Sequence, residues 1–211
     1  MTRGGDLILI LDFGSQYTQL IARRIRELNV FSEILQCDIS VDRIKSMNPK
    51  GVILSGGPES VTESNTPRIP KTIFELEVPV LGICYGMHTL AEQFGGQVTS
   101  SKNKEFGHAK IFIESASLLF DGFISGSSVD VWMSHGDHVS TLPDEFNLIA
   151  STSSAPIAGM EHSKKPIYAL QFHPEVTHTK QGNIILENFP HKICKCSAQW
   201  KIENLIEQRI D

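Results

Sequence analysis

The sequence lacks the features that mark membrane-spanning, secreted and nucleic-acid-binding proteins. Its longest apolar run near the N-terminus, Leu7 to Leu11, is far shorter than the roughly 20 residues that a membrane-spanning helix needs. No signal-peptide pattern occurs there. The formal net charge is -5 and no run of basic residues is present, so nothing predicts binding to nucleic acid or to an anionic membrane. We therefore expect a cytoplasmic protein with neither kind of partner.

Cysteine is also scarce, with four residues in a chain of 211: Cys37, Cys84, Cys194 and Cys196. This number does not indicate a disulfide framework. The pair Cys194 and Cys196 has no convincing second pair beside it, so the zinc site is incomplete and we predict no bound metal. Internal repeats and low-complexity segments are absent from the sequence.

What is present is an ordinary globular composition. Hydrophobic residues make up 40% of the chain and charged residues 20%. A chain of this length is expected to form one domain with one sizeable core.

The first half alternates between strand and helix patterns. Leu7 to Leu11 is a continuous apolar run, which is typical of a strand buried on both faces. Helical spacing follows from Tyr17 to Leu28, with Ser15 as the expected N-cap. The alternation continues through strands at Phe31 to Leu35, Gly51 to Leu54 and Val78 to Ile83, and helices at Val41 to Met47 and Ile69 to Glu75. This order predicts an α/β fold of three layers, in which helices flank a mostly parallel central sheet.

The second half is richer in strands. After Gly95-Gly96, extended segments are expected at 109–113, 129–133, 148–152, 157–160 and 167–172. Two helical patterns end the chain, from Gly182 to Phe189 and in a tail with an apolar stripe of Ile202, Leu205, Ile206 and Ile210.

A nucleophile motif stands where the strand Val78 to Ile83 should lead into a helix. Gly82-Ile-Cys84-Tyr-Gly86 has the form of a nucleophile elbow, a sharp strand-to-helix turn that crowds its flanking positions. Glycine at positions 82 and 86 removes that crowding, and the helix N-terminus favours a thiolate. Taken alone, Cys84 could equally be a small buried residue at a tight turn.

Two further motifs follow strands that should end at the same edge of the sheet. His173-Pro-Glu175 can supply a base and the group that orients it. Ser55-Gly56-Gly57-Pro58 can direct backbone N–H groups at a developing oxyanion. Each motif is weak by itself, but together they predict a site of nucleophilic catalysis at the carboxyl edge of the sheet.

These motifs resemble those of the class I (triad) glutamine amidotransferases, and the resemblance covers nearly the whole chain. It implies a flavodoxin-like fold and L-glutamine as the substrate. The resemblance also implies that Cys84 is the nucleophile, His173 the base, Glu175 its orienter, and the N–H groups of Gly57 and Tyr85 the oxyanion hole. The substrate contacts that it implies are Gly56, His88, Ser134, His135, Gly136 and Asp137.

Within that family, longer strings are most similar to the amidotransferase domains of GMP synthetases. They are Leu11 to Gln19, Ser55 to Ser60, Asp130 to Asp137 and His173 to Thr179. The resemblance implies a domain over residues 1–192, and a linker and helix over 193–211 that lead towards an ATP pyrophosphatase domain of the same or a partner chain.

In GMP synthetases, that second domain uses the ammonia to convert XMP to GMP. Its S-G-G-V-D-S phosphate loop does not occur in this sequence. The resemblance therefore implies no cofactor in this chain, ATP and Mg in the missing synthetase domain, and a homodimer for the full-length enzyme.

His88 departs from the family pattern, which has glutamine four residues after the cysteine. Positions 84 and 88 are one helical turn apart, so both can face the site. Histidine is shorter in reach, could carry charge and cannot offer both amide groups.

Two other functions stay open at this point. One is an amidotransferase that serves another synthase, or a stand-alone hydrolase of γ-glutamyl bonds. The other is a catalytically silent interaction module with the same fold, for which the presence of Cys84, His173 and Glu175 is the counter-evidence.

Overall fold

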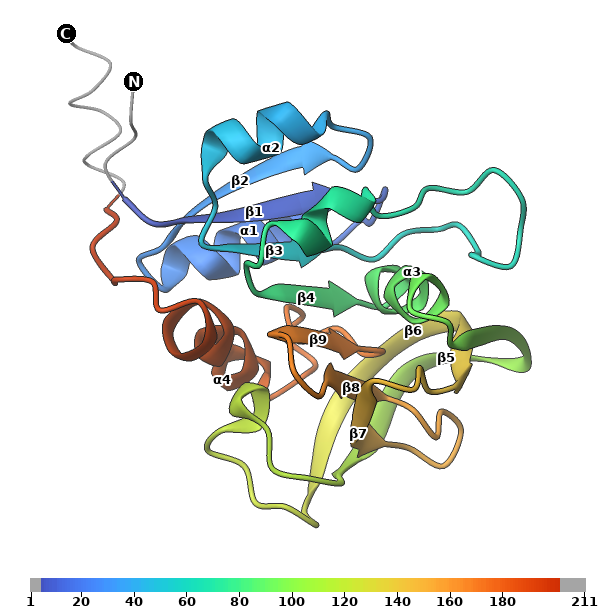
Figure 1. Cartoon of the computed structure of the whole chain (residues 1–211). Helices are drawn as coiled ribbons and strands as arrows, with labels where there is room; N and C mark the ends of the chain where they lie inside the picture. Colours follow the sequence, from blue (N-terminus) through green and yellow to red (C-terminus); the bar gives the residue numbers. More distant parts are fainter. Residues whose placement is uncertain (1–4, 202–211) are drawn as a thin grey trace, which may run out of the picture.

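The protein forms a single sheet with helices on both faces (Figure 1). The structure is a computed structural model that describes residues 5–201. Its nine strands lie in the order β2-β1-β3-β4-β9-β8-β7-β5-β6. The strands are β1 (Leu7–Asp12), β2 (Phe31–Gln36), β3 (Gly51–Leu54), β4 (Val80–Ile83), β5 (Gln97–Ile113), β6 (Ser128–Thr141), β7 (Phe146–Ser151), β8 (Gly159–His162) and β9 (Ile167–Leu170).

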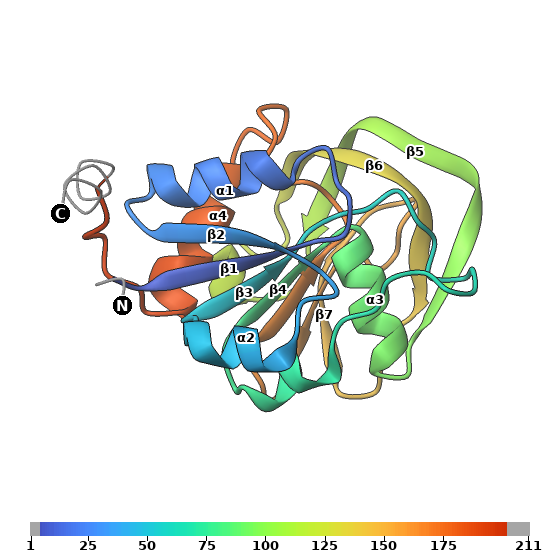
Figure 2. The ribbon, with the colours of Figure 1, turned by 90° about the horizontal axis from the view of Figure 1, so that it is seen from above.

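The first half of the chain, together with β9, builds the parallel part of the sheet. Strands β2, β1, β3, β4 and β9 run parallel, as the alternating pattern predicted. The α-helices are α1 (Thr18–Glu27), α2 (Val41–Met47) and α3 (Tyr85–Gln93), and α4 (Gly182–Glu187), which follows β9. Viewed from above, α1 and α4 cover one face and α2 and α3 the other (Figure 2). The α/β fold expected from the sequence is therefore confirmed.

The run Leu7 to Leu11 is apolar throughout because both faces of β1 are buried. Ile8 and Ile10 pack in the core beneath α1 and α4, whereas Leu9 and Leu11 pack in the core beneath α2 and α3. Successive side chains of a strand point to opposite faces, so one strand supplies both cores.

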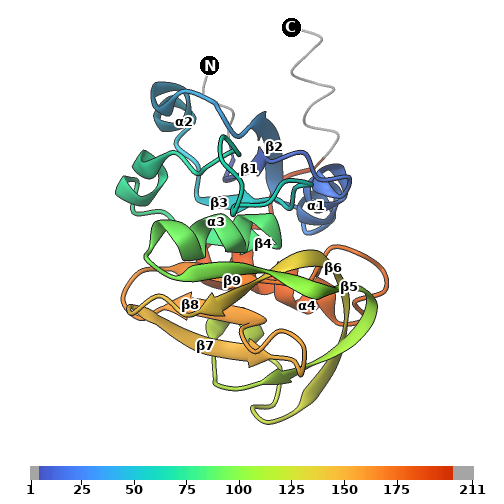
Figure 3. The same cartoon turned by 90° about the vertical axis from the view of Figure 1, so that its right-hand side faces the viewer.

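The second half extends the sheet with antiparallel strands. β8 pairs antiparallel with β9, β7 with β8, and β5 with both β7 and β6. β5 and β6 are long and bent, and they pass below α3 (Figure 3). This bend brings residues from the middle of β6 close to the start of α3, where Cys84 lies.

Three local expectations were wrong in detail. The N-cap of α1 is Tyr17, not Ser15; Ser15 instead accepts the Tyr17 N–H in a turn before the helix. The segment expected as a helix from Ile69 to Glu75 is a short 3-10 helix, Lys71–Glu75. α4 ends earlier than predicted, and the chain continues as a π-helical segment, Asn188–Ile193.

Residues 193–201 pack onto the rest of the molecule. Cys194 and Cys196 are buried in the core beneath α1 and α4. Trp200 donates its backbone N–H to Asn29, and its ring lies 6.0 Å from that of Phe31. The apolar stripe predicted from Ile202 to Ile210 lies outside the described residues.

Within residues 5–201, no helix is both long enough and apolar enough to cross a membrane.

Candidate active site

Cys84 lies in the turn between β4 and α3, as the elbow pattern predicted. Its backbone has φ 52° and ψ -105°, in a region that residues other than glycine rarely adopt. Its N–H donates to the Leu170 carbonyl of β9 at 2.8 Å, and its carbonyl accepts the His88 N–H of α3 at 3.1 Å. These bonds, one to the neighbouring strand and one to the following helix, hold the turn in its strained conformation.

Two close approaches explain the glycines that flank Cys84. A Cβ atom on Gly86 would lie 2.5 Å from the Leu54 carbonyl oxygen of β3. A Cβ atom on Gly82 would lie 2.8 Å from the Gly86 backbone. Distances this short are not found for real side chains, so the turn requires glycine at both positions.

His173 and Glu175 follow β9, the strand that pairs with β4. His173 Nδ1 lies 2.7 Å from Glu175 Oε1, and the two residues are 3% and 1% exposed. The backbone of His173 is fixed on both sides, since its N–H donates to Trp132 and its carbonyl accepts the Thr179 hydroxyl. Glu175 therefore holds the ring in one orientation, with Nε2 left for another partner.

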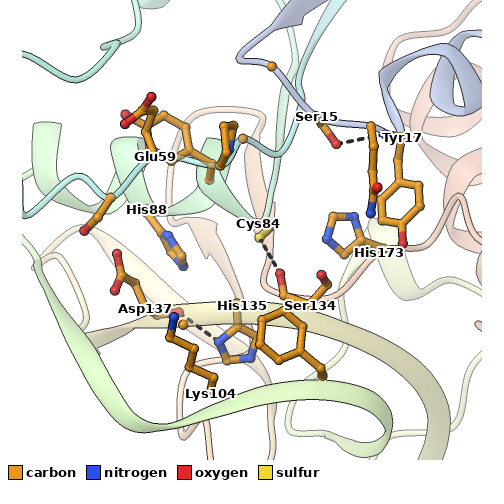
Figure 4. Close-up of a pocket in the computed structure, with 18 of the residues that line it drawn as sticks. Ser15, Tyr17, Glu59, Cys84, His88, Lys104, Ser134, His135, Asp137 and His173 are labelled. Carbon is orange, nitrogen blue, oxygen red and sulfur yellow. Dashed lines mark hydrogen bonds between the residues drawn. The ribbon is translucent and has the colours of Figure 1, made fainter.

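The structure places His173 beside Cys84 (Figure 4). Gly56 lies next to both, because a Cβ atom on Gly56 would be 3.3 Å from His173 Cε1 and 3.6 Å from Cys84 Cβ. Burial disfavours the charged imidazolium, but the Glu175 carboxylate and the Cys84 side chain outweigh that effect. Together they raise the pKa of His173 well above its ordinary value. The site thus favours a charged imidazolium next to the sulfur.

The predicted oxyanion groups come from two chain segments, the loop after β3 and the start of α3, that contact each other beside Cys84. Tyr85 is the first residue of α3, where N–H groups have no acceptor within the helix. Gly86 donates to the Ser55 carbonyl, which joins the start of α3 to the loop that contains Gly57. Gly57 packs against the chain at Phe13, whose carbonyl oxygen would be 2.6 Å from an added Cβ. Gly57 can therefore occupy this position because glycine has no side chain.

A cavity of about 660 Å³ opens above Cys84. Of the predicted site residues, those that line it are Gly57, Cys84, Tyr85, His88, Ser134, His135, Gly136, Asp137 and His173. Glu175 and Gly56 are not part of its lining, although Glu175 contacts His173 and Gly56 lies next to Cys84 and His173. The carboxylates Glu59, Glu63 and Asp137 and the ammonium of Lys104 give the wall charges of both signs.

His88 is almost fully buried, and its Nε2 lies 2.8 Å from Gln171 Oε1. Burial lowers the pKa of His88 to about 4, an effect that the Gln171 hydrogen bond only partly opposes. The sequence left open that His88 carries a charge; in the folded protein its ring is neutral at neutral pH.

The Ser134 to Asp137 segment of β6 meets the cavity mainly through its backbone. The Ser134 carbonyl oxygen lies 3.6 Å from the Cys84 sulfur. His135 directs Nδ1 at the Asp137 carbonyl oxygen and Nε2 at the Glu105 carboxylate, so both ring nitrogens already have protein partners. Asp137 accepts the Ser100 hydroxyl at 2.7 Å. The structure brings these residues to the site, with their polar atoms partly engaged.

Gln171 was not among the predicted site residues, although it reaches Cys84. Its amide nitrogen lies 3.9 Å from the Cys84 sulfur, within the range of a weak hydrogen bond to sulfur. The available signal was its spacing: the expected strand 167–172 places Gln171 two residues before His173, and side chains two apart in a strand face the same side. Lys104 was also missed, and no local pattern marks it.

The motifs, the fold and the cavity define a class of protein, and comparison with known families agrees. The family model for class-I glutamine amidotransferases matches residues 9–193. The chain belongs to that family.

Within this family, curated proteins that match the chain are named GMP synthases. The chain is 56% identical to the glutamine-hydrolysing GMP synthase of Methylococcus capsulatus and 55% identical to that of Teredinibacter turnerae, over 96% and 97% of its length. It spans 40% of the length of each relative.

Solved structures show the same fold. A putative GMP synthase subunit from Thermoplasma acidophilum is 31% identical with a TM-score of 0.76, and the match covers 99% of this chain and 100% of that one. A glutamine amidotransferase from Thermotoga maritima has a TM-score of 0.72 at 18% identity, with coverage of 92% and 100%. These likenesses confirm the expected flavodoxin-like amidotransferase fold.

Proposed function

We propose that this chain hydrolyses L-glutamine through Cys84, His173 and Glu175 and supplies the ammonia for ATP-dependent amination of XMP to GMP. The observation that carries the proposal is the strained Cys84 turn with the buried His173–Glu175 pair on the adjoining strand. A histidine held by a carboxylate next to a thiol is the arrangement that nucleophilic catalysis needs.

In the first step, His173 Nε2 takes the thiol proton of Cys84. The thiolate attacks the side-chain carboxamide carbon of glutamine, and a carbon–sulfur bond forms while the carbonyl electrons move to oxygen. The N–H groups of Gly57 and Tyr85 donate to that oxygen, which stabilises the tetrahedral intermediate. Glu175 keeps the imidazolium in place without taking its proton.

In the second step, His173 returns the proton to the amide nitrogen. The carbon–nitrogen bond breaks, ammonia leaves, and a glutamyl thioester remains on Cys84. Water, with its proton taken by His173, then hydrolyses the thioester to glutamate and frees the thiol. Glutamine and water thus give glutamate and ammonia, and the enzyme is regenerated.

The walls of the cavity suit the other end of glutamine. A free amino acid carries an ammonium and a carboxylate, and the cavity offers carboxylates and Lys104. Ser134, Gly136 and Asp137 would hold the amino-acid end mainly through β6 backbone atoms, while His135 stiffens that strand. Gly56 supports the proposal differently, because its lack of a side chain leaves room between His173 and Cys84.

The use of the ammonia is proposed from the relatives. The curated relatives that match this chain are named GMP synthases, and this chain spans 40% of their length. We assign the amination to an ATP pyrophosphatase domain of the same or a partner chain, which would also bind ATP and Mg²⁺. Residues 193–211 would lead towards it.

A glutamine-mimicking electrophile tests the nucleophile directly. The isolated chain is incubated with the reagent, digested, and the adduct located by mass spectrometry. We expect one adduct, on Cys84, that excess glutamine suppresses. Cys37 is the matched control because it is a half-buried free thiol away from the cavity. An adduct on Cys37 rather than Cys84, or ammonia release that survives Cys84→Ala, would overturn the proposal.

The second half of the proposal needs the full-length protein. With glutamine, ATP and XMP together, we expect GMP to form, and Cys84→Ala should remove the glutamine-dependent reaction while free ammonia still supports amination. Failure to aminate XMP from either nitrogen source would show that the chain serves a different synthase.

A further inference from the structure

His88 and Gln171 join α3 to the segment after β9 through a buried side-chain contact. His88 Nε2 lies 2.8 Å from Gln171 Oε1, and the residues are 3% and 0% exposed. An amide oxygen accepts hydrogen bonds but cannot donate them. His88 must therefore carry its proton on Nε2, which leaves Nδ1 as an acceptor.

The far end of the Gln171 amide faces the nucleophile. Gln171 Nε2 lies 3.9 Å from the Cys84 sulfur. Because His88 holds the amide oxygen, the NH₂ group is the end that is turned towards the sulfur. The reverse orientation would direct the amide oxygen at a thiolate and would be repelled by it.

We propose that His88 is a positioning residue that acts through Gln171: its ring N–H fixes the amide so that Gln171 donates to the Cys84 thiolate. This inference rests on the proposed function and deepens it, since it assigns His88 a task at the nucleophile rather than a contact with substrate. Gln171 becomes a second donor to the sulfur, beside His173.

The burial of His88 suits this task. Burial is the largest cause of its lowered pKa, His135 and His138 act in the same direction, and Asp137 opposes them, so the ring is neutral above a pH of about 4. A neutral ring has one N–H, and its position on Nε2 determines which way the amide turns. The orientation is thus the same across the whole pH range in which the enzyme is expected to work.

Alkylation of Cys84 by iodoacetamide measures the thiolate without using the glutamine pocket. The rate is followed at the Cys84 peptide by mass spectrometry from about pH 5 to about pH 10, a range that spans most perturbed thiol pKa values. Gln171→Met keeps the length of the side chain and removes the amide. We expect the midpoint of its profile to rise by about one pH unit, with about tenfold slower alkylation at neutral pH.

The His88 variants separate positioning from substrate contact. His88→Leu should raise the midpoint in the same direction by about half as much, and lower kcat for glutamine more than it changes KM. His88→Gln, which keeps an N–H donor, should restore alkylation to within about twofold of the original rate. The double variant of His88→Leu and Gln171→Met should behave as Gln171→Met alone, because His88 acts only through Gln171.

Two surface substitutions serve as controls: His178→Leu and Gln36→Met replace exposed side chains away from the cavity. If His88→Leu does not fold, as judged by circular dichroism, His88→Phe provides a ring without an N–H.

Coincident profiles for Gln171→Met and the unchanged protein would overturn the inference. Additive effects in the double variant, or a His88→Leu variant altered only in KM, would do so as well. Failure of the proposed function itself looks different: ammonia release would then survive Cys84→Ala, whatever the alkylation profiles show.

Discussion

His173 Nδ1 lies 2.7 Å from Glu175 Oε1, and Pro174 is the residue that joins them. Both side chains are buried, and Glu175 Oε2 has no hydrogen-bond partner among the described residues. Among the described residues, the His173 imidazole is therefore the hydrogen-bond partner of this carboxylate. A buried carboxylate with one partner has a large effect on that partner, because little water is present to weaken the interaction.

Replacement of Glu175 by glutamine tests this relationship. The amide of Glu175→Gln can still accept from His173 but carries no charge, so it stabilises the imidazolium less. We expect kcat for glutamine hydrolysis to fall by at least about tenfold with little change in KM, since the interaction strengthens as charge develops on the ring. Steady-state ammonia release measures both constants.

Glu187→Gln is the matched control, because Glu187 is an exposed carboxylate at the end of α4. It should leave kcat unchanged. If Glu175→Gln also left kcat unchanged, the orienting role of Glu175 would be wrong.

Gly86→Ala tests the steric basis of the elbow. The new Cβ would lie 2.5 Å from the Leu54 carbonyl oxygen, so β3 or α3 must shift. We expect the free energy of unfolding to fall by about 2 kcal/mol, which is typical of overpacking in a buried region, and glutaminase activity to fall with it. Urea unfolding gives the stability.

Gly5→Ala provides the comparison, because a Cβ there meets no atom within 4 Å. Its unfolding free energy should match that of the unchanged protein. Equal stabilities for Gly86→Ala and Gly5→Ala would mean that the elbow tolerates a side chain.

The parallel part of the fold could be predicted because its signals are local. The Leu7 to Leu11 run is apolar on both faces, and Cys84 stands between glycines where a strand should end. Strands with such runs lie in the middle of parallel sheets, and parallel strands end at one edge. Sequence patterns therefore placed Cys84 and His173 near each other, although 89 positions separate them in the numbering.

Contacts made by the antiparallel extension and by buried polar pairs could not be predicted in this way. The pairing of His135 with Glu105 depends on the register between β5 and β6, which includes an irregularity between Ser100 and Glu105. The contact of His88 with Gln171 joins residues on elements that meet only in the folded protein. The spacing of residues within one helix or strand cannot predict such pairs.

Tyr85→Phe tests whether Tyr85 acts through its backbone. The Tyr85 hydroxyl donates to the Pro67 carbonyl at 2.6 Å and accepts from Arg68 at 3.4 Å, both in the loop after β3, while its N–H is the proposed oxyanion donor. We expect kcat to change by less than about twofold and the free energy of unfolding to fall by about 1 to 2 kcal/mol, the usual effect of losing the hydrogen bonds of one hydroxyl.

Gly57→Ala changes the other oxyanion position and gives the contrast. Its Cβ would lie 2.6 Å from the Phe13 carbonyl oxygen and should displace the loop. We expect kcat to fall by about a hundredfold or more if the N–H is moved out of place. A large loss of kcat in Tyr85→Phe would assign catalysis to the hydroxyl instead.

His88 should make the stability of the protein depend on pH in the acid range. Burial lowers its pKa from 6.5 to about 4, so between these values the unfolded chain binds a proton that the folded protein does not. The free energy of unfolding therefore rises with pH across this window. The contribution of His88 to stability is fully present above about pH 6.5 and is lost as the pH falls towards 4. At about 1.4 kcal/mol per pKa unit, the contribution is roughly 3 kcal/mol.

His88→Gln isolates this contribution, because His135 and His162 also have lowered pKa values and add slopes of the same sign. His173 does not interfere in this window: its pKa is raised, so it is protonated in both states there, and its own loss of stability comes as the pH rises above about 6.5. We expect urea unfolding of His88→Gln to show a shallower rise between about pH 4 and about pH 6.5. An exposed histidine replaced in the same way, His178→Gln, should retain the original slope. If the slope of His88→Gln equalled that of the unchanged protein, His88 would be reachable by protons in the folded state, and the buried neutral ring on which the Gln171 contact depends would be wrong.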